Sequence, residues 1–431
     1  MRLSVACNFD PELLVGLRPY PVYEVYGKLT TDYYGGGRPS FYLPEVDKQG
    51  VADYVRRAHA EGLKFNYLLN ASCMGNLEYT REGQHQLRET LDWLSEIGVD
   101  SITVANHLFL RTIKQCYPHF RVRLSAHRYS DNPRKIRFWQ EEGADCIVVS
   151  EVNIYREFKI LEGIRKAATT ADLQLIVNNS CRQDCAIAAN HATGLSHGSQ
   201  KGSKGFPLDY CFVFCQHLKL TKPVNFLRAN WIRPEDLHHY EELGFDNFKI
   251  VERNSPTKAL IQRTKAYAER SFDGNLMDLV QCYAYPEEHF SEREKDAYST
   301  KRMVKYFVRP RTINLVKFLK VVQLGHAMSL LYPRQGEAGV VVDNKAMDGF
   351  IDRFRKTSCQ ALDCHSCRYC HHWAEAHVRI DPDYRERVVG LLGELLDEMY
   401  SGSFWSSYAR GAQWMMQGVW SQLTSGREAQ A

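Results

Sequence analysis

Short runs of apolar and β-branched residues recur along the N-terminal part of the chain, and longer polar stretches with helical character separate them. This alternation predicts β-strands joined by helices, the pattern of βα units in a parallel sheet. The expected strands are Arg2–Cys7, Val22–Thr30, Lys64–Ser72, Ser101–Ala105, Arg121–Ala126, Cys146–Ser150, Leu173–Asn178, Asn225–Ala229 and Asn247–Val251.

A glycine recurs shortly before four of these strands, at Gly62, Gly98, Gly143 and Gly244. Each suits the left-handed position that ends a helix and leads the chain into the next strand. Eight or nine such units before residue 255 match the usual size of a (β/α)₈ barrel. A doubly wound sheet is the alternative, but no Gly-x-Gly-x-x-Gly turn follows the first strand.

Beyond residue 255 the strand pattern fades and helical periodicity dominates, continuing from Asp383 to Leu423 before an end that is expected to fray. The predicted fold class is therefore α/β. We expect a TIM-like (β/α)₈ barrel over residues 1–270 and a mainly helical module with cysteines over residues 271–431. A chain of 431 residues with 44% hydrophobic content can bury a core of that size.

Two glycine-rich stretches are expected to form loops over a site. Gly35–Pro39 follows the second strand and lacks the Lys-Ser/Thr pair of a phosphate-binding loop. His191–Pro207 is rich in glycine and serine, a composition typical of loops that fold over a binding site.

The formal charge is +4, from 55 basic and 51 acidic residues, so nothing in the whole-chain charge demands a nucleic-acid or membrane partner. Locally, residues 301–336 contain eight Lys or Arg and no Asp or Glu. This stretch indicates either a helical face paired with acidic residues elsewhere or a surface that binds RNA. No apolar run is long enough to span a bilayer and no secretion signal is visible, so we expect a cytoplasmic protein without a membrane partner.

Thirteen cysteines, an odd number, are better explained by metal binding than by disulfides in a reducing compartment. Five are scattered through strand-like or helix-like contexts, where a thiol acts as a small apolar group, and are assigned no chemistry. They are Cys7, Cys73, Cys116, Cys146 and Cys282. The other eight form two groups of four.

The first quartet consists of two Cys-x-x-x-Cys pairs, Cys181 with Cys185 and Cys211 with Cys215. Cys181 comes just after a predicted strand, at the end of a barrel where active sites are built. Four thiolates with this loose spacing predict a four-iron four-sulfur (4Fe-4S) cluster, and zinc is the alternative ligand.

The second quartet has the spacing C-x₄-C-x₂-C-x₂-C and consists of Cys359, Cys364, Cys367 and Cys370. This spacing is strongly indicative of a metal centre. A second 4Fe-4S cluster and a structural zinc ion both remain open, because His365, His371 and His372 lie close by in the sequence.

Several short motifs along the chain resemble those of the collagenase-like peptidase family U32 over about 260 N-terminal positions. They are Val25-Tyr26-Gly27, Asn70 at a strand end, Ser125-Ala126-His127 through Asn132, the two cysteine pairs, and Pro234-Glu235-Asp236-Leu237 before Lys249-Ile250-Val251-Glu252-Arg253. The chain departs from the family pattern in the position of Glu252 and in its symmetrical cysteine pairs.

Members of that family include proteins named as collagenases, the tRNA and ribosomal RNA hydroxylation proteins, and the paired proteins of oxygen-independent ubiquinone hydroxylation. The hydroxylation groups carry a 4Fe-4S cluster and some depend on prephenate. The resemblance therefore implies oxygen-independent hydroxylation, or a related redox modification, of RNA or a small molecule. It alone nominates Tyr26, Asn70, Lys249 and Arg253 as catalytic residues.

Some further residues are nominated from their own chemistry. Arg38, Arg128 and Arg182 lie on loops after predicted strands and can each clamp a carboxylate of an anionic cofactor such as prephenate, although ordinary surface arginines are the alternative. His127 can act as an acid or base near neutral pH, and a core histidine is the alternative.

Two other classes of function stay open. A peptidase needs a nucleophile with a base or an open metal site, but His-Glu-x-x-His and Gly-x-Ser-x-Gly are both absent from the sequence. A non-catalytic electron-transfer protein is compatible with two clusters, and an electron-donor protein is then the expected partner. A peptide is the remaining class of substrate.

Overall fold

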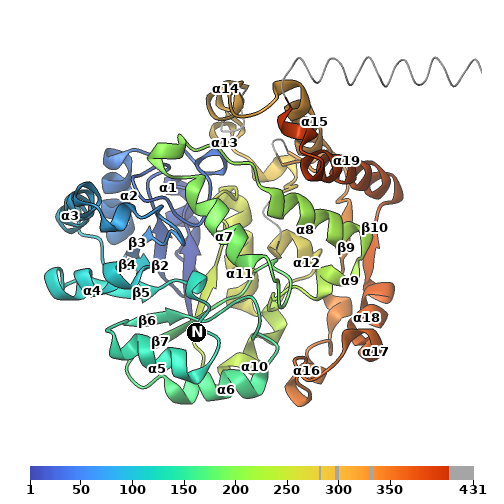
Figure 1. The fold of residues 1–431 in the computed structure, drawn as a ribbon. Helices are drawn as coiled ribbons and strands as arrows, with labels where there is room; N and C mark the ends of the chain where they lie inside the picture. Colours follow the sequence, from blue (N-terminus) through green and yellow to red (C-terminus); the bar gives the residue numbers. More distant parts are fainter. Residues whose placement is uncertain (281–282, 297–299, 331–332, 407–431) are drawn as a thin grey trace, which may run out of the picture.

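Eight parallel strands close into a barrel in the N-terminal part of the chain (Figure 1). The computed structural model describes residues 1–280, 283–296, 300–330 and 333–406, so Cys282 and the end of the chain lie outside the described residues. β1 pairs with both β2 and β8, which closes the ring in sequence order. The strands are β1 (Arg2–Ala6), β2 (Val22–Gly27), β3 (Lys64–Leu69), β4 (Ser101–Val104), β5 (Arg121–Leu124), β6 (Cys146–Val148), β7 (Asp172–Ile176) and β8 (Asn247–Ile250).

Amphipathic helices surround this barrel, as the alternation predicts. In α3, for example, Leu87, Leu91 and Leu94 recur at helical spacing and are fully buried. The helices of this part are α1 (Pro11–Leu17), α2 (Lys48–Ala60), α3 (Arg81–Glu96), α4 (His107–Cys116), α5 (Pro133–Glu141), α6 (Phe158–Ala167), α7 (Ala188–His197), α8 (Tyr210–Thr221), α9 (Val224–Leu227), α10 (Leu237–Glu241) and α11 (Thr257–Glu269). All four predicted turn glycines adopt positive φ values, from 73° to 100°.

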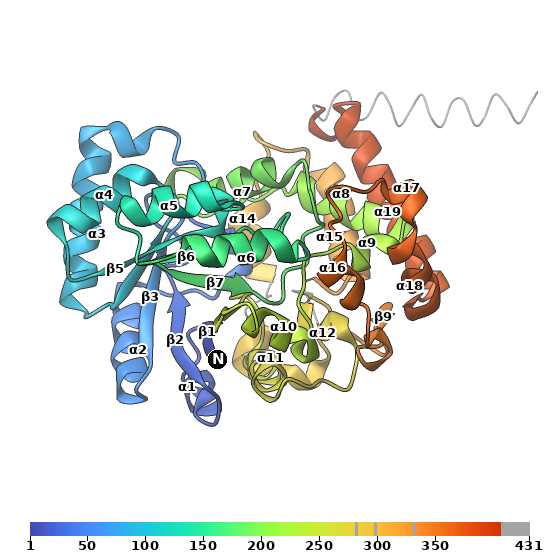
Figure 2. The ribbon, with the colours of Figure 1, turned by 90° about the horizontal axis from the view of Figure 1, so that it is seen from below.

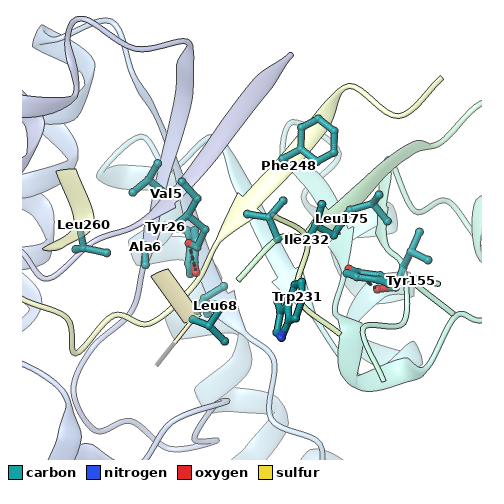
Figure 3. Packing of buried hydrophobic residues seen from close by; sticks show 14 of the residues in the cluster. Val5, Ala6, Tyr26, Leu68, Tyr155, Leu175, Trp231, Ile232, Phe248 and Leu260 are labelled. Atoms are coloured by element: carbon teal, nitrogen blue, oxygen red, sulfur yellow. Dashed lines mark hydrogen bonds between the residues drawn. The ribbon is translucent and has the colours of Figure 1, made fainter. Parts of the chain in front are cut away.

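Buried side chains from neighbouring strands fill the core between these layers. Figure 3 shows Val5 of β1, Leu175 of β7 and Phe248 of β8 in this packing, together with Trp231 and Ile232 from the segment before α10. The described residues of the predicted (β/α)₈ barrel thus share one continuous apolar core with most of the chain that follows.

One predicted strand is wrong: most of Asn225–Ala229 belongs to the short helix α9 (Val224–Leu227) instead. The Asn225 side chain donates hydrogen bonds to the carbonyls of Leu218 and Lys222, which ties this run to the end of α8. A short apolar run fits a buried strand and a buried helix equally well, so the sequence pattern alone could not separate them.

The stretch predicted as a loop from His191 to Pro207 is partly helical. Its first half completes α7, which ends at His197, and a 3₁₀ turn follows at Lys201–Ser203. Gly194 has open space beside its Cα, and a helix tolerates such a glycine at a modest cost in stability. As expected, the stretch nevertheless lies over the carboxyl ends of the barrel strands, where the cavity described below opens.

The remainder of the chain is mainly helical, with one small antiparallel ribbon of β9 (Val340–Val342) and β10 (Val378–Ile380). Its helices are α12 (Leu276–Val280), α13 (Glu292–Asp296), α14 (Thr300–Phe307), α15 (Leu315–Ala327), α16 (Asp352–Lys356), α17 (Cys364–Cys367), α18 (Tyr369–His377) and α19 (Pro382–Tyr400). Figure 2 shows these elements beside the barrel, with α19 packed on α8 and α18 on α9. The domain boundary near residue 270 stays a prediction.

Three basic residues of the stretch 301–336 are paired with acidic residues. Their ion pairs join Lys305 to Glu45, Lys317 to Glu398 and Lys320 to both Glu394 and Glu398, at 2.5 to 2.9 Å. These pairs are what the first alternative, a paired helical face, leads one to expect, and RNA binding by the stretch stays a prediction. Among the described helices, none is both long and apolar enough to cross a membrane.

Candidate active site and cysteine centres

A cavity of about 260 Å³ opens at the carboxyl ends of the barrel strands, the end at which barrel enzymes place their chemistry. Most of the residues nominated from the sequence line it. They are Tyr26, Asn70, His127, Lys249, Arg253, Arg38, Arg182 and the first cysteine quartet, Cys181, Cys185, Cys211 and Cys215. Arg128 is the exception among the nominated arginines, because its side chain is exposed and does not line the cavity.

Lys249 extends from β8 into the barrel, and its side chain is 7% exposed. Its Nζ lies 3.9 Å from the centre of the Tyr26 ring, and the Tyr26 hydroxyl donates to the carbonyl of Ile250. Burial, and then the positive charge of Arg123, lower the pKa of Lys249 to about 7. A lysine that changes charge near neutral pH can exchange a proton with a bound substrate.

His127 stands on a 3₁₀ turn after β5 and is held by the end of β3. Its Nδ1 lies 3.2 Å from the carbonyl oxygen of Asn70, which can only accept, so Nδ1 carries the proton and Nε2 is left as an acceptor. Burial lowers the pKa of His127 to about 4, so the ring is neutral at pH 7. A Cβ added at Gly37 would come 3.0 Å from the His127 ring, so only glycine lets the loop approach this closely.

The glycine-rich loop after β2 is fixed to the segment after β8 by an ion pair between Arg38 and Glu252. The Arg38 Nε donates to Glu252 Oε2 at 3.1 Å, and its Nη2 donates to the other carboxylate oxygen. Glu252 has a φ of +88°, a backbone conformation that is rare and strained for a residue with a side chain. Backbone strain of this kind is common at functional sites. Here the strained backbone directs the Glu252 carboxylate toward the glycine-rich loop.

The cavity also contains acidic groups that the sequence reasoning missed. Burial raises the pKa of Glu151 to about 7, and its Oε2 is buried without a hydrogen-bond partner among the described residues. His191 and Asp209 form a second pair, with the His191 Nε2 lying 3.0 Å from Asp209. Glu151 comes directly after the predicted strand Cys146–Ser150, and that place was the signal that could have found it.

Helix α8 presents half of the first quartet on one face. Cys211, Cys215 and Lys219 recur every four residues, so their side chains point to the same side, toward the cavity. The Lys219 Nζ donates to the carbonyl of Ser180 at 2.8 Å, beside Cys181. Burial raises the pKa of Cys181 to about 12 and that of Cys211 to about 11, so these thiols bind metal only by losing protons.

The second quartet lies on the loop and short helices from α16 to α18. Glu157, at the start of α6, accepts hydrogen bonds from the backbone N–H groups of Cys359 and Gln360. The Arg353 Nη2 lies 3.2 Å from the Sγ of Cys367. Cys364 is exposed, whereas burial raises the pKa of Cys359 to about 12.

Each quartet offers four thiols, the set of donors that either a zinc ion or a 4Fe-4S cluster would require. Among the described residues, only His238, His239 and Glu242 bring three metal-binding atoms within 4.8 Å of one another. The choice between a cluster and zinc stays a prediction for both quartets.

A second cavity, of about 540 Å³, lies between α12, the end of α15 and the start of α19. It is larger, but none of the nominated catalytic, cofactor-binding or metal-binding residues lines it. We therefore place the candidate active site in the barrel cavity, where titratable groups and thiols converge.

Comparison with known proteins connects this site to a family. Residues 41–181 match the sequence model of Peptidase family U32, a segment that includes Asn70, His127 and Cys181. Over this segment the chain is similar to peptidase family U32. The other three thiols of the first quartet and the whole second quartet lie beyond the matched U32 segment.

Three individual proteins resemble the chain. An uncharacterized protease of Methanocaldococcus jannaschii is 26% identical over 349 residues, which are 81% of this chain and 87% of that protein. The tRNA hydroxylation protein P1 of Bacillus subtilis is 30% identical over 118 residues, 27% of this chain and 26% of that protein. A solved structure of a U32 peptidase is 21% identical with a TM-score of 0.43, covering 57% of this chain and 90% of that one.

Proposed function

We propose that the chain is an iron–sulfur enzyme that carries out oxygen-independent hydroxylation, or a related redox modification, of an RNA base or a small molecule. The convergence of the first cysteine quartet with Lys249, Glu151 and His127 in one barrel cavity carries this proposal. A bound 4Fe-4S cluster would supply one-electron chemistry at that place. The similarity to the tRNA hydroxylation protein supports the same class of reaction.

The side chains around the first quartet have different roles in the proposed reaction. Lys249 and Glu151, which both have a pKa of about 7, exchange protons with the substrate at neutral pH. The neutral His127 offers Nε2 as an acceptor toward the cavity. Arg38 and Arg182 are placed to bind the carboxylates of an anionic co-substrate, and the family resemblance implies prephenate in that role.

The cavity restricts the substrate to something small, or to one group of a larger molecule. About 260 Å³ admits a single nucleobase or a metabolite but not a folded polymer. An RNA substrate would therefore insert one base, while its phosphates would remain outside the barrel. The lysines of residues 301–336 are mostly occupied by acidic partners, so the similarity to the tRNA hydroxylation protein is what favours RNA.

The substrate class is tested by comparing RNA nucleosides from cells with and without the protein. We expect one hydroxylated nucleoside to disappear when the gene is removed and to return with the unaltered chain but not with Cys181→Ser. Unchanged RNA profiles would exclude RNA, and anionic metabolites would then be screened with the anaerobically prepared protein.

A peptidase is the second candidate, because the relative that matches most of the chain is named a protease. Cleavage of casein or gelatin by the purified protein, abolished by one substitution of a cavity residue, would support it. If the purified protein binds iron and cleaves neither casein nor gelatin, the result would favour the redox function.

The second quartet is expected to hold a separate centre. Cys367→Ser should remove its metal and lower the thermal stability of the C-terminal helices, because metal binding is coupled to folding. Iron analysis and absorption at about 400 nm should show the first centre unchanged, since the two quartets share no ligand. Simultaneous loss of both signals would contradict two separate sites.

A further inference from the structure

One short backbone segment, residues 228–230, lies between the two cysteine quartets. On its first side it pairs with the loop that carries the first quartet: Arg182 and Ala229 form an antiparallel bridge. The Asn230 N–H donates to the carbonyl of Cys181 at 2.9 Å, and the Gln183 N–H donates to the carbonyl of Arg228 at 2.7 Å. Paired strands of this kind lie about 5 Å apart.

On its other side the same segment meets the second quartet through Arg156. This guanidinium is 1% exposed and donates to the carbonyls of Leu227 and Ala229. Glu157, the next residue along the chain, accepts hydrogen bonds from the backbone N–H groups of Cys359 and Gln360. α9, which precedes this segment, packs directly against α18, which carries Cys370 (Figure 2).

The hydrogen-bonded chain from Cys181 through Asn230 and Ala229 to Arg156 therefore ends next to Glu157, which is hydrogen-bonded to the backbone of Cys359. Electron transfer through protein weakens steeply with distance, and a short path of packed and hydrogen-bonded groups favours it. Nothing in the barrel fold requires a second thiol group at this place.

The two quartets also differ in access. The first lines the cavity under α7 and α8, whereas Cys364 of the second is exposed on the outer surface. Basic residues outnumber acidic ones in the chain around the second quartet. Between residues 352 and 370 these are Arg353, Arg355, Lys356 and Arg368 against Asp352 and Asp363. Arg355 pairs with Glu242 and Arg368 with Glu375, so it is the exposure of Cys364, and not a net charge, that makes this quartet accessible to a partner protein.

We propose that the two quartets form one electron path, in which the second quartet's centre receives electrons from a one-electron carrier protein and passes them to the first. Each transfer oxidises the carrier by one electron and reduces the second centre. That electron then moves to the first centre, which leaves the second oxidised again; no bond is broken and no proton is required. This path rests on the proposed function, because it needs an iron–sulfur centre at each quartet.

The test follows reduction of the first centre in the full-length, anaerobically reconstituted protein by stopped-flow absorption. A reduced [2Fe-2S] ferredoxin serves as the protein donor, and methyl viologen radical serves as a small donor that can enter the cavity. In Cys367→Ser we expect the ferredoxin rate to fall by an order of magnitude or more and the viologen rate to stay unchanged.

Unchanged rates with both donors in Cys367→Ser, or an equal fall with both, would overturn the path, because a relay must affect only the protein donor. Failure of the first quartet to assemble an iron–sulfur centre at all would instead refute the proposed function. Electron paramagnetic resonance gives an independent readout. Two reduced centres this close should broaden each other's signals, and the broadening should vanish in Cys367→Ser.

Arg353→Gln provides a second variant that keeps all eight thiols. It removes the charged donor to Cys367, and hydrogen bonds to cluster sulfurs raise the reduction potential. We expect the potential of the second centre to fall while that of the first stays the same. A shift of the first centre instead would contradict the assignment of Cys367 to the second.

Discussion

Cys215→Ser should yield a folded protein that lacks the centre beside the cavity and has no modification activity. Cys215 projects from the middle of α8 beside Cys211, and serine fits the same helical position. A serine oxygen is a poor ligand for iron in place of a thiolate. If both quartets hold cubes, iron should fall from about eight to about four atoms per chain.

The matched control is Cys73→Ser, which changes another partly buried cysteine that does not line the cavity. It should keep the full iron content and activity. Circular dichroism should show that both variants retain the helical content of the unaltered protein. Equal iron in Cys215→Ser and the unaltered chain, or stoichiometric zinc in both, would contradict an iron–sulfur centre at the first quartet.

The barrel could be predicted from the sequence because its signals are local and repeated. Each of the eight true strands coincides with an apolar run, and the glycines that precede four of them adopt the left-handed conformation that was expected. α9 was missed because its four residues are too few to show a helical period. The helical half of the His191–Pro207 stretch was missed because glycine and serine concealed it.

The candidate site was predicted less completely, because many of its residues come together only in the folded structure. Cysteine spacing identifies both quartets without a structure, because thiol groups in this pattern have few other uses. The ion pair between Arg38 and Glu252 joins residues more than 200 positions apart, so no local pattern could reveal it. Arg128 and Arg182 both follow strands, and only the structure shows that Arg182 lines the cavity while Arg128 is exposed.

Lys249 is a buried amine that the barrel interior holds at a cost in stability. Its ammonium is buried near Arg123 and Arg253, two other cations, and Glu24 supplies the opposing charge. Glu24 is already engaged by Arg123 and by the Ser4 hydroxyl. Protonation of Lys249 in the folded state is therefore unfavourable, which is why its pKa falls to about 7.

Lys249→Met is expected to abolish activity and, at neutral pH, to stabilise the fold. The pKa of Lys249 is about 7 in the folded chain, whereas an unfolded lysine has a pKa of about 10.4. Between these two values the unfolded chain binds more protons, so the stability of the unaltered protein rises with pH across that window. Below pH 7 the penalty is at its largest, on the order of 4 kcal/mol, and methionine removes it.

Urea unfolding of both proteins at pH 7 and at pH 10 measures this effect. The stability advantage of Lys249→Met should be large at pH 7 and should nearly disappear at pH 10, where the amine is largely neutral in the folded protein and its penalty has mostly lifted. Lys114→Met is the control, because Lys114 forms a surface ion pair with Asp145 and should change stability by no more than about 1 kcal/mol.

A Lys249→Met protein that is less stable than the original at pH 7 would show that the amine is a structural support. If Lys249→Met retains activity, Lys249 takes no part in the proposed proton exchange. If Lys249→Met is inactive but more stable than the original, the lysine is a buried charge that serves the reaction and not the fold.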